Sequence, residues 1–307
     1  MFMTTAASPV EILRQTFGAA AQEHVTLAPY TSARIGGPAD VLLTVKSADQ
    51  LADAMRLIWE HDLPHYILGG GSNVLVSDKG FRGVVVLNRA KEIRFETGDQ
   101  PRVWCESGVV ISNLAKRCAS KGLGGLEWSA TIPGTVGGAV YGNAGAFGGD
   151  MTYNLISAEL LTKNGRETFT LEQFGYGYRT SVLKRHDVDG IVLSALLKLK
   201  NSTVTEASVK IEQFSERRKA TQPPGASMGS MFKNPAGDHA GRLIEAAGLK
   251  GTRVGAAEIS RMHGNFFINH GETKAEDVRA LIALVQKTVF EKFGIELELE
   301  VELIGNW

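Results

Sequence analysis

Apolar and polar residues alternate with two periods in the N-terminal part of the chain, one typical of strands and one typical of helices. Residues 40–45 fit a strand, and apolar residues at helical spacing follow a helix-capping sequence that begins at Ser47. A second strand is predicted over residues 66–68, so this part of the chain forms a β-α-β unit. The unit ends directly in LGGGSNVL at residues 68–75, the first glycine-rich loop. Open α/β sheets bind phosphates at such turns.

The same two periods predict the remaining elements. Further strands are expected over residues 83–87, 103–106, 155–162, 167–170 and 191–200, with a near-strand at 263–269. Helices are expected over residues 9–20 behind Ser8 as the cap, over 111–121, 204–220 and 240–247, and from a cap at Thr273 onward. The Asn164-Gly165 dipeptide suits the type I′ turn of a hairpin between two of these strands. The sequence QPPG at residues 222–225 ends a charged helix and marks an inter-domain boundary.

The C-terminal sequence IELELEVEL, residues 295–303, alternates apolar and acidic residues without a break. This pattern predicts one half-buried strand with a single polar face. The face carries Glu296, Glu298, Glu300 and Glu302, and periodicity does not choose among them. A solvated sheet edge is the plainest interpretation of all four.

Residues 132–149, the second glycine-rich loop, interrupt both periods. Seven of the nineteen residues from 132 to 150 are glycine, and no charged side chain precedes Asp150. Such a run suits a backbone that reaches positive φ or approaches a bulky, phosphorylated ligand closely. A flexible linker is the alternative, but it would expose Tyr141 and Phe147. Neither GxGxxG nor GxxxxGK[ST] occurs, so a standard Rossmann or P-loop site is not predicted.

Composition narrows the class of protein further. The 307 residues are 43% hydrophobic and 21% charged, as in a soluble globular protein. Lys+Arg and Asp+Glu each number 33, so no net charge favours nucleic acid or an anionic membrane as a partner. No apolar run approaches the length of a membrane span, and we expect a cytoplasmic protein.

Cysteine and histidine offer little chemistry. Cys105 and Cys118 fit neither a disulfide framework nor a metal cluster, and we expect them to be packing residues. His239 and His263 lack HExxH spacing, so no metal site is predicted. In HGNFFIN, residues 263–269, His263 fits a structural hydrogen-bonding role better than that of a base.

Two other residues have neighbours that suggest chemistry. Arg179, in YRTS, has an aromatic neighbour and local hydroxyl groups that suit an anion site, although most arginines are surface charges. Ser230, in GSMFKNP, is flanked by bulky side chains and followed by Lys233 and Asn234. No GxSxG sequence surrounds it, which argues against acyl transfer. A serine beside a cation can instead donate a proton.

These segments, taken together and in order, resemble the family of UDP-N-acetylenolpyruvoylglucosamine reductase, the MurB family. The resemblance rests on RIGGPA at 34–39, LGGGSNVL at 68–75, IPGTVGGAVYGNAGAFGG at 132–149, YRTS at 178–181, GSMFKNP at 229–235, HGNFFIN at 263–269 and Glu300-Val301. The spacing from Arg179 to Ser230 is similar to that of the shorter, type II branch. The chain departs from the family at Thr131, where glycine is more usual.

The resemblance implies an α+β protein with the FAD-binding fold of vanillyl-alcohol oxidase, also called PCMH-like. It implies two α/β FAD-binding subdomains, residues 1–88 and 89–202, and a C-terminal α/β substrate-binding domain, residues 203–307. The protein is expected to be a monomer. The residues matched to FAD contacts are Leu68, Gly69, Gly70, Gly71, Ser72, Asn73, Val74, Leu75, Ile132, Pro133, Gly134, Val136, Gly137, Gly138, Asn143, Gly145 and Ala146.

The activity implied by the resemblance is NADPH-dependent reduction of UDP-N-acetylglucosamine enolpyruvate to UDP-N-acetylmuramate, a step in peptidoglycan precursor synthesis. NADPH and the sugar nucleotide use one pocket in turn. Arg179 and Glu300 match the pair that polarises the substrate carboxylate and stabilises an enolate, and Ser230 matches the proton donor. The residues matched to substrate contacts are Arg218, Gly229, Lys233 and Asn234.

Two other functions remain open at this stage. The first is another FAD-dependent oxidase or dehydrogenase of the same fold. Many of these tether FAD through histidine or cysteine near the first glycine-rich loop, and residues 69–75 contain neither. The second is a non-catalytic flavoprotein that binds a nucleotide sugar, against which the presence of Arg179, Ser230 and Glu300 argues.

Overall fold

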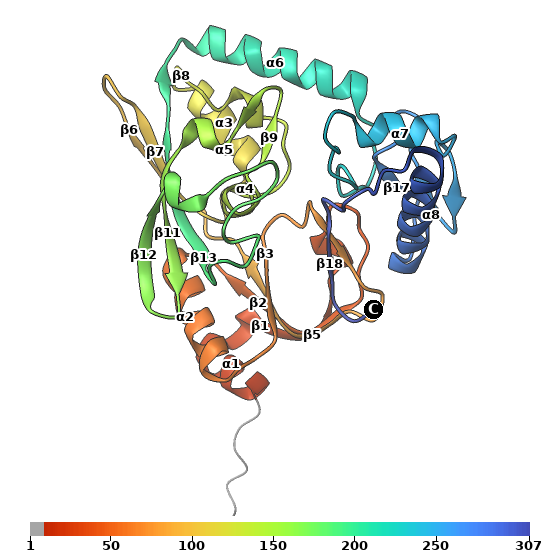
Figure 1. Cartoon of the computed structure of the whole chain (residues 1–307). Coiled ribbons are helices and arrows are strands. Elements are labelled where there is room, and N and C mark those ends of the chain that lie inside the picture. Colours follow the sequence, from red (N-terminus) through yellow and green to blue (C-terminus); the bar gives the residue numbers. More distant parts are fainter. Residues whose placement is uncertain (1–8) are drawn as a thin grey trace, which may run out of the picture.

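The computed structural model describes residues 9–307 of the chain (Figure 1). The predicted cap Ser8 lies outside the described residues. Helix α1 (Pro9–Phe17) confirms the first predicted helix, but it ends before Ala20 because Gly18–Ala20 forms a 3-10 turn.

The first sheet has the strand order β1-β2-β5-β3. Its strands are β1 (Ala21–Thr26), β2 (Pro38–Val45), β5 (Phe81–Asn88) and β3 (His65–Leu68). The strands β2, β5 and β3 are parallel, and α2 (Ala48–Glu60) connects β2 to β3, which confirms the β-α-β unit. The predicted cap is also confirmed, because the Ser47 hydroxyl accepts a hydrogen bond from the Gln50 N–H at 3.1 Å.

The second sheet is antiparallel, with the order β12-β11-β13-β7-β6. Its strands are β12 (Gly165–Thr170), β11 (Leu155–Thr162), β13 (Ile191–Lys198), β7 (Arg102–Glu106) and β6 (Ile93–Glu96). The same part of the chain contains the helices α3 (Ile111–Ala119), α4 (Val136–Gly142) and α5 (Met151–Asn154). Cys105 and Cys118 are buried in this core, as predicted, and burial raises the pKa of Cys118 to about 12.

The hairpin β11–β12 is confirmed, but its predicted turn type is wrong. Thr162 pairs with Gly165, so Lys163 and Asn164 form the loop. A type I′ turn needs positive φ at both central residues, and neither has it. Gly165, at φ 122°, takes the unusual backbone conformation instead.

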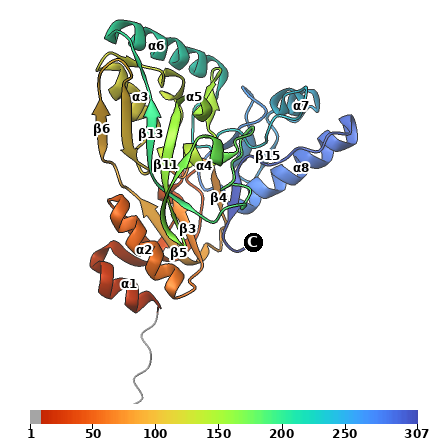
Figure 2. The same ribbon diagram turned by 60° about the vertical axis from the view of Figure 1, so that its left-hand side comes forward.

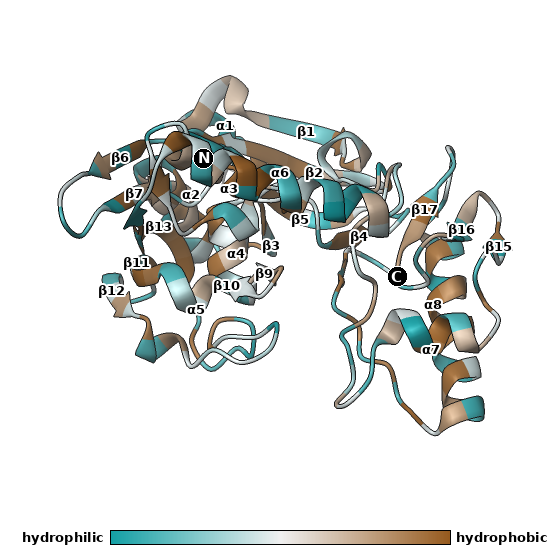
Figure 3. Cartoon of the chain, turned by 90° about the horizontal axis from the view of Figure 1, so that it is seen from above, coloured by the Kyte–Doolittle hydropathy of each residue, from teal (hydrophilic) through white to brown (hydrophobic). Residues whose placement is uncertain are grey.

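Helix α6 (Val204–Thr221) connects the second sheet to the C-terminal part of the chain (Figure 2). It begins with a capping box in which Thr203 and Glu206 each bond the other's backbone N–H. The C-terminal part contains the helices α7 (Ala240–Ala246) and α8 (Ala275–Phe293) and a sheet of β15 (Arg253–Val254), β16 (Ala257–Ile259) and β17 (Phe267–Asn269). Seen from above, these elements form a lobe beside the two larger sheets (Figure 3).

The predicted C-terminal strand over residues 295–303 is wrong in extent. Only Glu302–Ile304 forms a strand, β18, which pairs in parallel with β4 (Val74–Val76) of the first unit. Upstream, Leu299 forms an isolated bridge with Phe232 in the C-terminal lobe. The segment therefore divides its partners between two parts of the molecule, so no continuous ladder forms.

The short strands complete the fold. They are β8 (Leu123–Gly124) with β14 (Lys200–Asn201), and β9 (Gly145–Ala146) with β10 (Gly149–Asp150). Within residues 9–307, no helix combines the length and the apolar character that crossing a membrane requires. The three-part division of the chain stays a prediction, and the return of β18 to β4 ties the last residues to the first unit.

Candidate active site

A cavity of about 790 Å³ is lined by both glycine-rich loops and by the C-terminal segment. Most of the predicted FAD residues line it: Leu68, Gly69, Gly70, Gly71, Ser72, Asn73, Val74, Ile132, Pro133, Gly134, Gly137, Gly138, Gly145 and Ala146. The other three, Leu75, Val136 and Asn143, are buried behind the lining. The cavity thus contains the residues that the sequence singled out for their backbone.

The two loops touch each other through their glycines. A Cβ on Gly70 would lie 2.7 Å from the Cα of Gly134, and a Cβ on Gly134 would lie 2.7 Å from the Ser72 hydroxyl oxygen. Among the described residues, the backbone N–H groups of Gly70, Gly71 and Ser72 donate to no protein acceptor. Free N–H groups without side chains in the way suit a phosphorylated cofactor, so the loops fit FAD.

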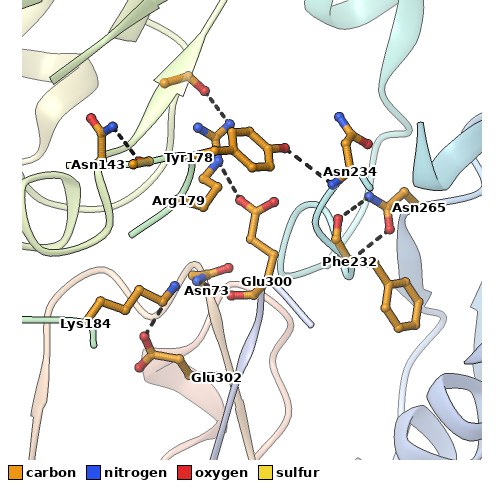
Figure 4. A network of polar contacts seen from close by, with 12 residues as sticks. Asn73, Asn143, Tyr178, Arg179, Lys184, Phe232, Asn234, Asn265, Glu300 and Glu302 are labelled. Carbon is orange, nitrogen blue, oxygen red and sulfur yellow. Dashed lines mark hydrogen bonds and ion pairs between the residues drawn. The ribbon is translucent and has the colours of Figure 1, made fainter. Parts of the chain in front are cut away.

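Arg179 reaches the cavity from the loop after β12 and is anchored at two points (Figure 4). Its Nε donates to Glu300 Oε1 at 2.9 Å and its Nη2 donates to the Gly145 carbonyl at 2.7 Å. Its backbone is left-handed, at φ 55°, a costly conformation for arginine that is typical of functional sites. A guanidinium has five N–H donors, so several remain for a ligand.

Backbone hydrogen bonds bring Glu300 and Ser230 to the same cavity, although seventy positions separate them. The Glu300 N–H donates to the Met231 carbonyl at 2.9 Å, and the Asn73 amide donates to the Glu300 carbonyl at 3.0 Å. Among residues 9–307 the Ser230 hydroxyl has no hydrogen-bond partner in the protein, and it lines the cavity. The three residues predicted to be catalytic therefore line one cavity, and their roles stay a prediction.

Asn265 holds the segment that carries Ser230, a role that the sequence did not reveal. Its amide accepts from the Phe232 N–H at 2.9 Å and donates to the Phe232 carbonyl at 2.8 Å. The backbone carbonyl of Asn265 accepts from the Met231 N–H at 2.8 Å. The sequence signal for this role of Asn265 was its place as a polar residue inside an otherwise apolar stretch. His263, as expected, is structural: Nδ1 accepts from the Asn265 N–H at 3.2 Å, and burial lowers its pKa.

The four predicted substrate residues divide into two groups. Arg218 and Gly229 line the cavity. The Arg218 guanidinium finds no partner among the described residues, and burial lowers its pKa. Lys233 instead forms an ion pair with Glu298, and Asn234 Oδ1 accepts from the Ala240 N–H at 3.1 Å. Neither of these two lines the cavity, and their substrate role stays a prediction.

The sequence predictions left out many residues of the cavity wall, and four polar ones among them bear on the site. Gln222, one helical turn after Arg218, has a buried side-chain oxygen with no partner in the described part of the chain. Tyr66, Lys184 and Glu302 form a polar cluster that also lines the cavity. Glu302 had a signal, because it shares the polar face of Glu300, but the other three had none nearby in the sequence.

Comparisons with known proteins agree on one family. Residues 220–304 match the family model of the UDP-N-acetylenolpyruvoylglucosamine reductase C-terminal domain, and residues 39–170 match an FAD binding domain. The chain is 45% identical to UDP-N-acetylenolpyruvoylglucosamine reductase of Bacillus subtilis, over 91% of this chain and 92% of the relative. It is 43% identical to that of Chloroflexus aggregans, over 90% and 94%.

A solved structure agrees with these matches. The chain is similar to UDP-N-acetylenolpyruvylglucosamine reductase (MurB) from Thermus caldophilus, with a TM-score of 0.79 and 38% sequence identity. The similarity covers 92% of this chain and 99% of that one.

Proposed function

This chain belongs to the UDP-N-acetylenolpyruvoylglucosamine reductase family of FAD-dependent oxidoreductases, and we propose that its Arg179, Ser230 and Glu300 perform the family's reaction. The reaction reduces UDP-N-acetylglucosamine enolpyruvate to UDP-N-acetylmuramate, with NADPH as the reductant, in peptidoglycan precursor synthesis. FAD, when bound, transfers two electrons from NADPH to the enolpyruvyl group.

The observation that supports this assignment best is the contact between Arg179 and Glu300, at 2.9 Å across one wall of the cavity. Reduction of the enolpyruvyl double bond places negative charge on the carbon next to the substrate carboxylate. The remaining N–H donors of Arg179 bind that carboxylate, and their fixed orientation stabilises the developing charge. Glu300 holds Arg179 in place and can share a proton with the carboxylate, since a second bare anion would repel it.

Ser230 supplies the proton that completes the reduction. Its hydroxyl has no protein acceptor among the described residues, so the O–H is available to a bound substrate. Arg218 and Gln222, one helical turn apart, also line the cavity, and neither side chain has a partner among the described residues. We infer that Arg218 binds the diphosphate of the sugar nucleotide and that Gly229, Lys233 and Asn234 complete the substrate contacts. We further infer that the protein acts as a monomer in the cytoplasm.

An anaerobic visible spectrum tests the proposed function. The purified protein is expected to show a flavin band that bleaches when NADPH is added and recovers when the UDP-linked enolpyruvyl sugar follows. Recovery only on admission of oxygen would point to an oxidase, and the absence of a flavin band would overturn the assignment.

Replacing Ser230 tests its role separately. Ser230→Ala is expected to lower the rate of flavin reoxidation by the enolpyruvyl substrate by about 10²–10⁴-fold, because the proton donor is lost. Bleaching by NADPH should remain, since that half-reaction does not use the hydroxyl. Ser227→Ala, in the same loop but outside the cavity lining, is the control. Equal reoxidation rates for the two variants would refute the role of Ser230.

A further inference from the structure

A second pair of opposite charges lies beside the Arg179–Glu300 pair (Figure 4). The Lys184 ammonium lies 3.8 Å from Glu302 Oε1, and the Tyr66 hydroxyl donates to Glu302 Oε2 at 2.9 Å. Burial, and then the negative charge of Glu302, raise the pKa of Tyr66 well above its ordinary value, so the phenol remains a donor. All three side chains line the cavity, and the roles assigned above leave them unused.

The backbone fixes the Glu302 carboxylate relative to the first glycine-rich loop. The Glu302 N–H donates to the Asn73 carbonyl at 3.0 Å, and Glu302 pairs with Val74 in the β18–β4 ladder. Tyr66 belongs to β3, the strand that leads directly into the same loop. The acid is therefore held by the part of the protein that is proposed to bind FAD.

The Lys184 ammonium is held only loosely. A separation of 3.8 Å is beyond hydrogen-bonding distance, and its Nζ has no other acceptor in the described part of the chain. Its side chain is only 16% exposed and faces the cavity, so none of its N–H groups is satisfied by the protein. A largely buried cation with unpaired donors is costly, and a ligand that offers an acceptor relieves that cost.

The loosely held Lys184 ammonium lies next to the proposed catalytic residues. Glu302 follows Glu300 by two residues, and both side chains line the same cavity. These groups line the cavity in which FAD would be held by the glycine-rich loops. Charged groups near the ring nitrogens tune the electronics of a bound flavin.

We propose that the Lys184–Glu302 pair, braced by Tyr66, sets the reduction potential of the bound flavin. The inference rests on the proposed function and goes beyond it. Lys184 offers its N–H donors and positive charge to the ring, which becomes more negative on reduction. Glu302 lies 3.8 Å from the ammonium and offsets part of its charge. The two residues therefore act on the potential in opposite directions.

Two substitutions of similar size separate the two effects. Lys184→Met removes the cation and leaves the Glu302 carboxylate beside the ring, so the midpoint potential should fall. Glu302→Gln keeps an acceptor for Tyr66 but leaves Lys184 uncompensated, so the potential should rise. Each shift should change the ratio of oxidised to reduced flavin at a fixed potential by about tenfold, or about 30 mV for a two-electron couple.

The measurement is an anaerobic spectroelectrochemical titration of the FAD-loaded full-length protein. Lys184→Arg, which keeps the charge, should remain near the wild-type potential. Shifts of opposite sign in Lys184→Met and Glu302→Gln would support the proposal. Unchanged potentials, or shifts of the same sign, would overturn it, because a purely structural pair has no reason to act in opposite directions.

The test distinguishes failure of this inference from failure of the proposed function. Wild-type protein that carries no flavin, or whose flavin NADPH does not reduce, contradicts the function itself. Wild-type protein that is reduced by NADPH and reoxidised by the enolpyruvyl sugar, while both variants keep its potential, contradicts only the role of Lys184 and Glu302.

Discussion

Glu258 shows how one buried acid organises several cations in the C-terminal lobe. Its side chain is only 6% exposed. It accepts from Arg253 Nε at 2.6 Å, contacts His270 Nε2 at 2.9 Å, and lies 3.3 Å from Arg261 Nε. Burial alone would raise the pKa of Glu258, but the hydrogen bonds and charges of Arg253 and His270 outweigh burial and lower it.

This lowered pKa makes the stability of the lobe depend on pH. Because the folded-state pKa lies below the unfolded-state value, the contribution is fully present above the unfolded-state pKa and is lost as the pH falls through the folded-state pKa. Glu258→Gln should lower the free energy of unfolding at pH 7 by about 1–3 kcal/mol. The lower end is expected because Arg253 and Arg261 are exposed and screened.

Urea unfolding of both proteins at pH 7 and at pH 4 measures the effect. The difference between wild type and Glu258→Gln should narrow at the lower pH. Glu245→Gln is the matched control, because Glu245 forms a more exposed ion pair with Lys250. This substitution should change the free energy of unfolding little at either pH. An equal difference in the free energy of unfolding at both pH values would contradict the stabilising role of the Glu258 carboxylate.

At the scale of elements, the start of α8 shows where local sequence signals fail. The sequence indicated Thr273 as the cap, but the Thr273 hydroxyl is buried without a partner among residues 9–307. Asp78, from the turn between β4 and β5, accepts instead from the N–H groups of Ala275 at 2.8 Å and Glu276 at 3.1 Å. The first unit therefore caps a helix of the C-terminal lobe, which the sequence pattern does not encode.

The capping arrangement predicts an unusual pair of mutational effects. Asp78→Ala should lower the free energy of unfolding by about 0.5–2 kcal/mol, the usual cost of losing a helix cap. Thr273→Val should be neutral or stabilising, because it removes a hydroxyl that has no hydrogen bond. Denaturant midpoints of the two variants measure this. If Thr273→Val lowered the free energy of unfolding as much as Asp78→Ala, Thr273 would be the cap after all, as the sequence indicated.

At the scale of the whole molecule, segments that are far apart in the sequence line the cavity together. Leu68 comes from the first sheet, Gly137 from the second glycine-rich loop, and Ser230 from the C-terminal lobe. The C-terminal segment crosses between them, with Glu300 hydrogen-bonded to Met231 and Glu302 to Asn73. A ligand that contacts several of these segments would stabilise their common arrangement.

FAD should accordingly stabilise the whole chain rather than one part of it. Binding to the folded state alone raises the free energy of unfolding by about 2.7 kcal/mol when free FAD is a hundredfold above its dissociation constant. Thermal unfolding at several FAD concentrations should show a midpoint that rises with the logarithm of concentration. Riboflavin, which lacks the diphosphate, is the control and should raise it less. A midpoint independent of FAD would contradict the cavity as the cofactor site.

Much of this protein was accessible from its sequence because the relevant signals are local. The β-α-β unit, the Ser47 cap and the two strands of the hairpin follow from periodicity and capping signals within a few residues, whereas the turn type of the hairpin did not. The glycine-rich loops are recognisable because a missing side chain is a property of the residue itself. Arg179, Ser230 and Glu300 were predicted as catalytic residues through motifs, although periodicity alone left Glu300 equivalent to its three acidic neighbours.

Only the tertiary structure decided which distant groups meet. The C-terminal segment looked like one strand, yet it divides its backbone bonds between Phe232 and β4. Asn265, Asp78 and the Lys184–Glu302 pair acquire their roles from partners far away in the sequence. The physical reason is that a hydrogen bond or ion pair depends on where two groups are placed in space. A local pattern determines which groups are available, and the path of the folded chain determines which of them are within reach.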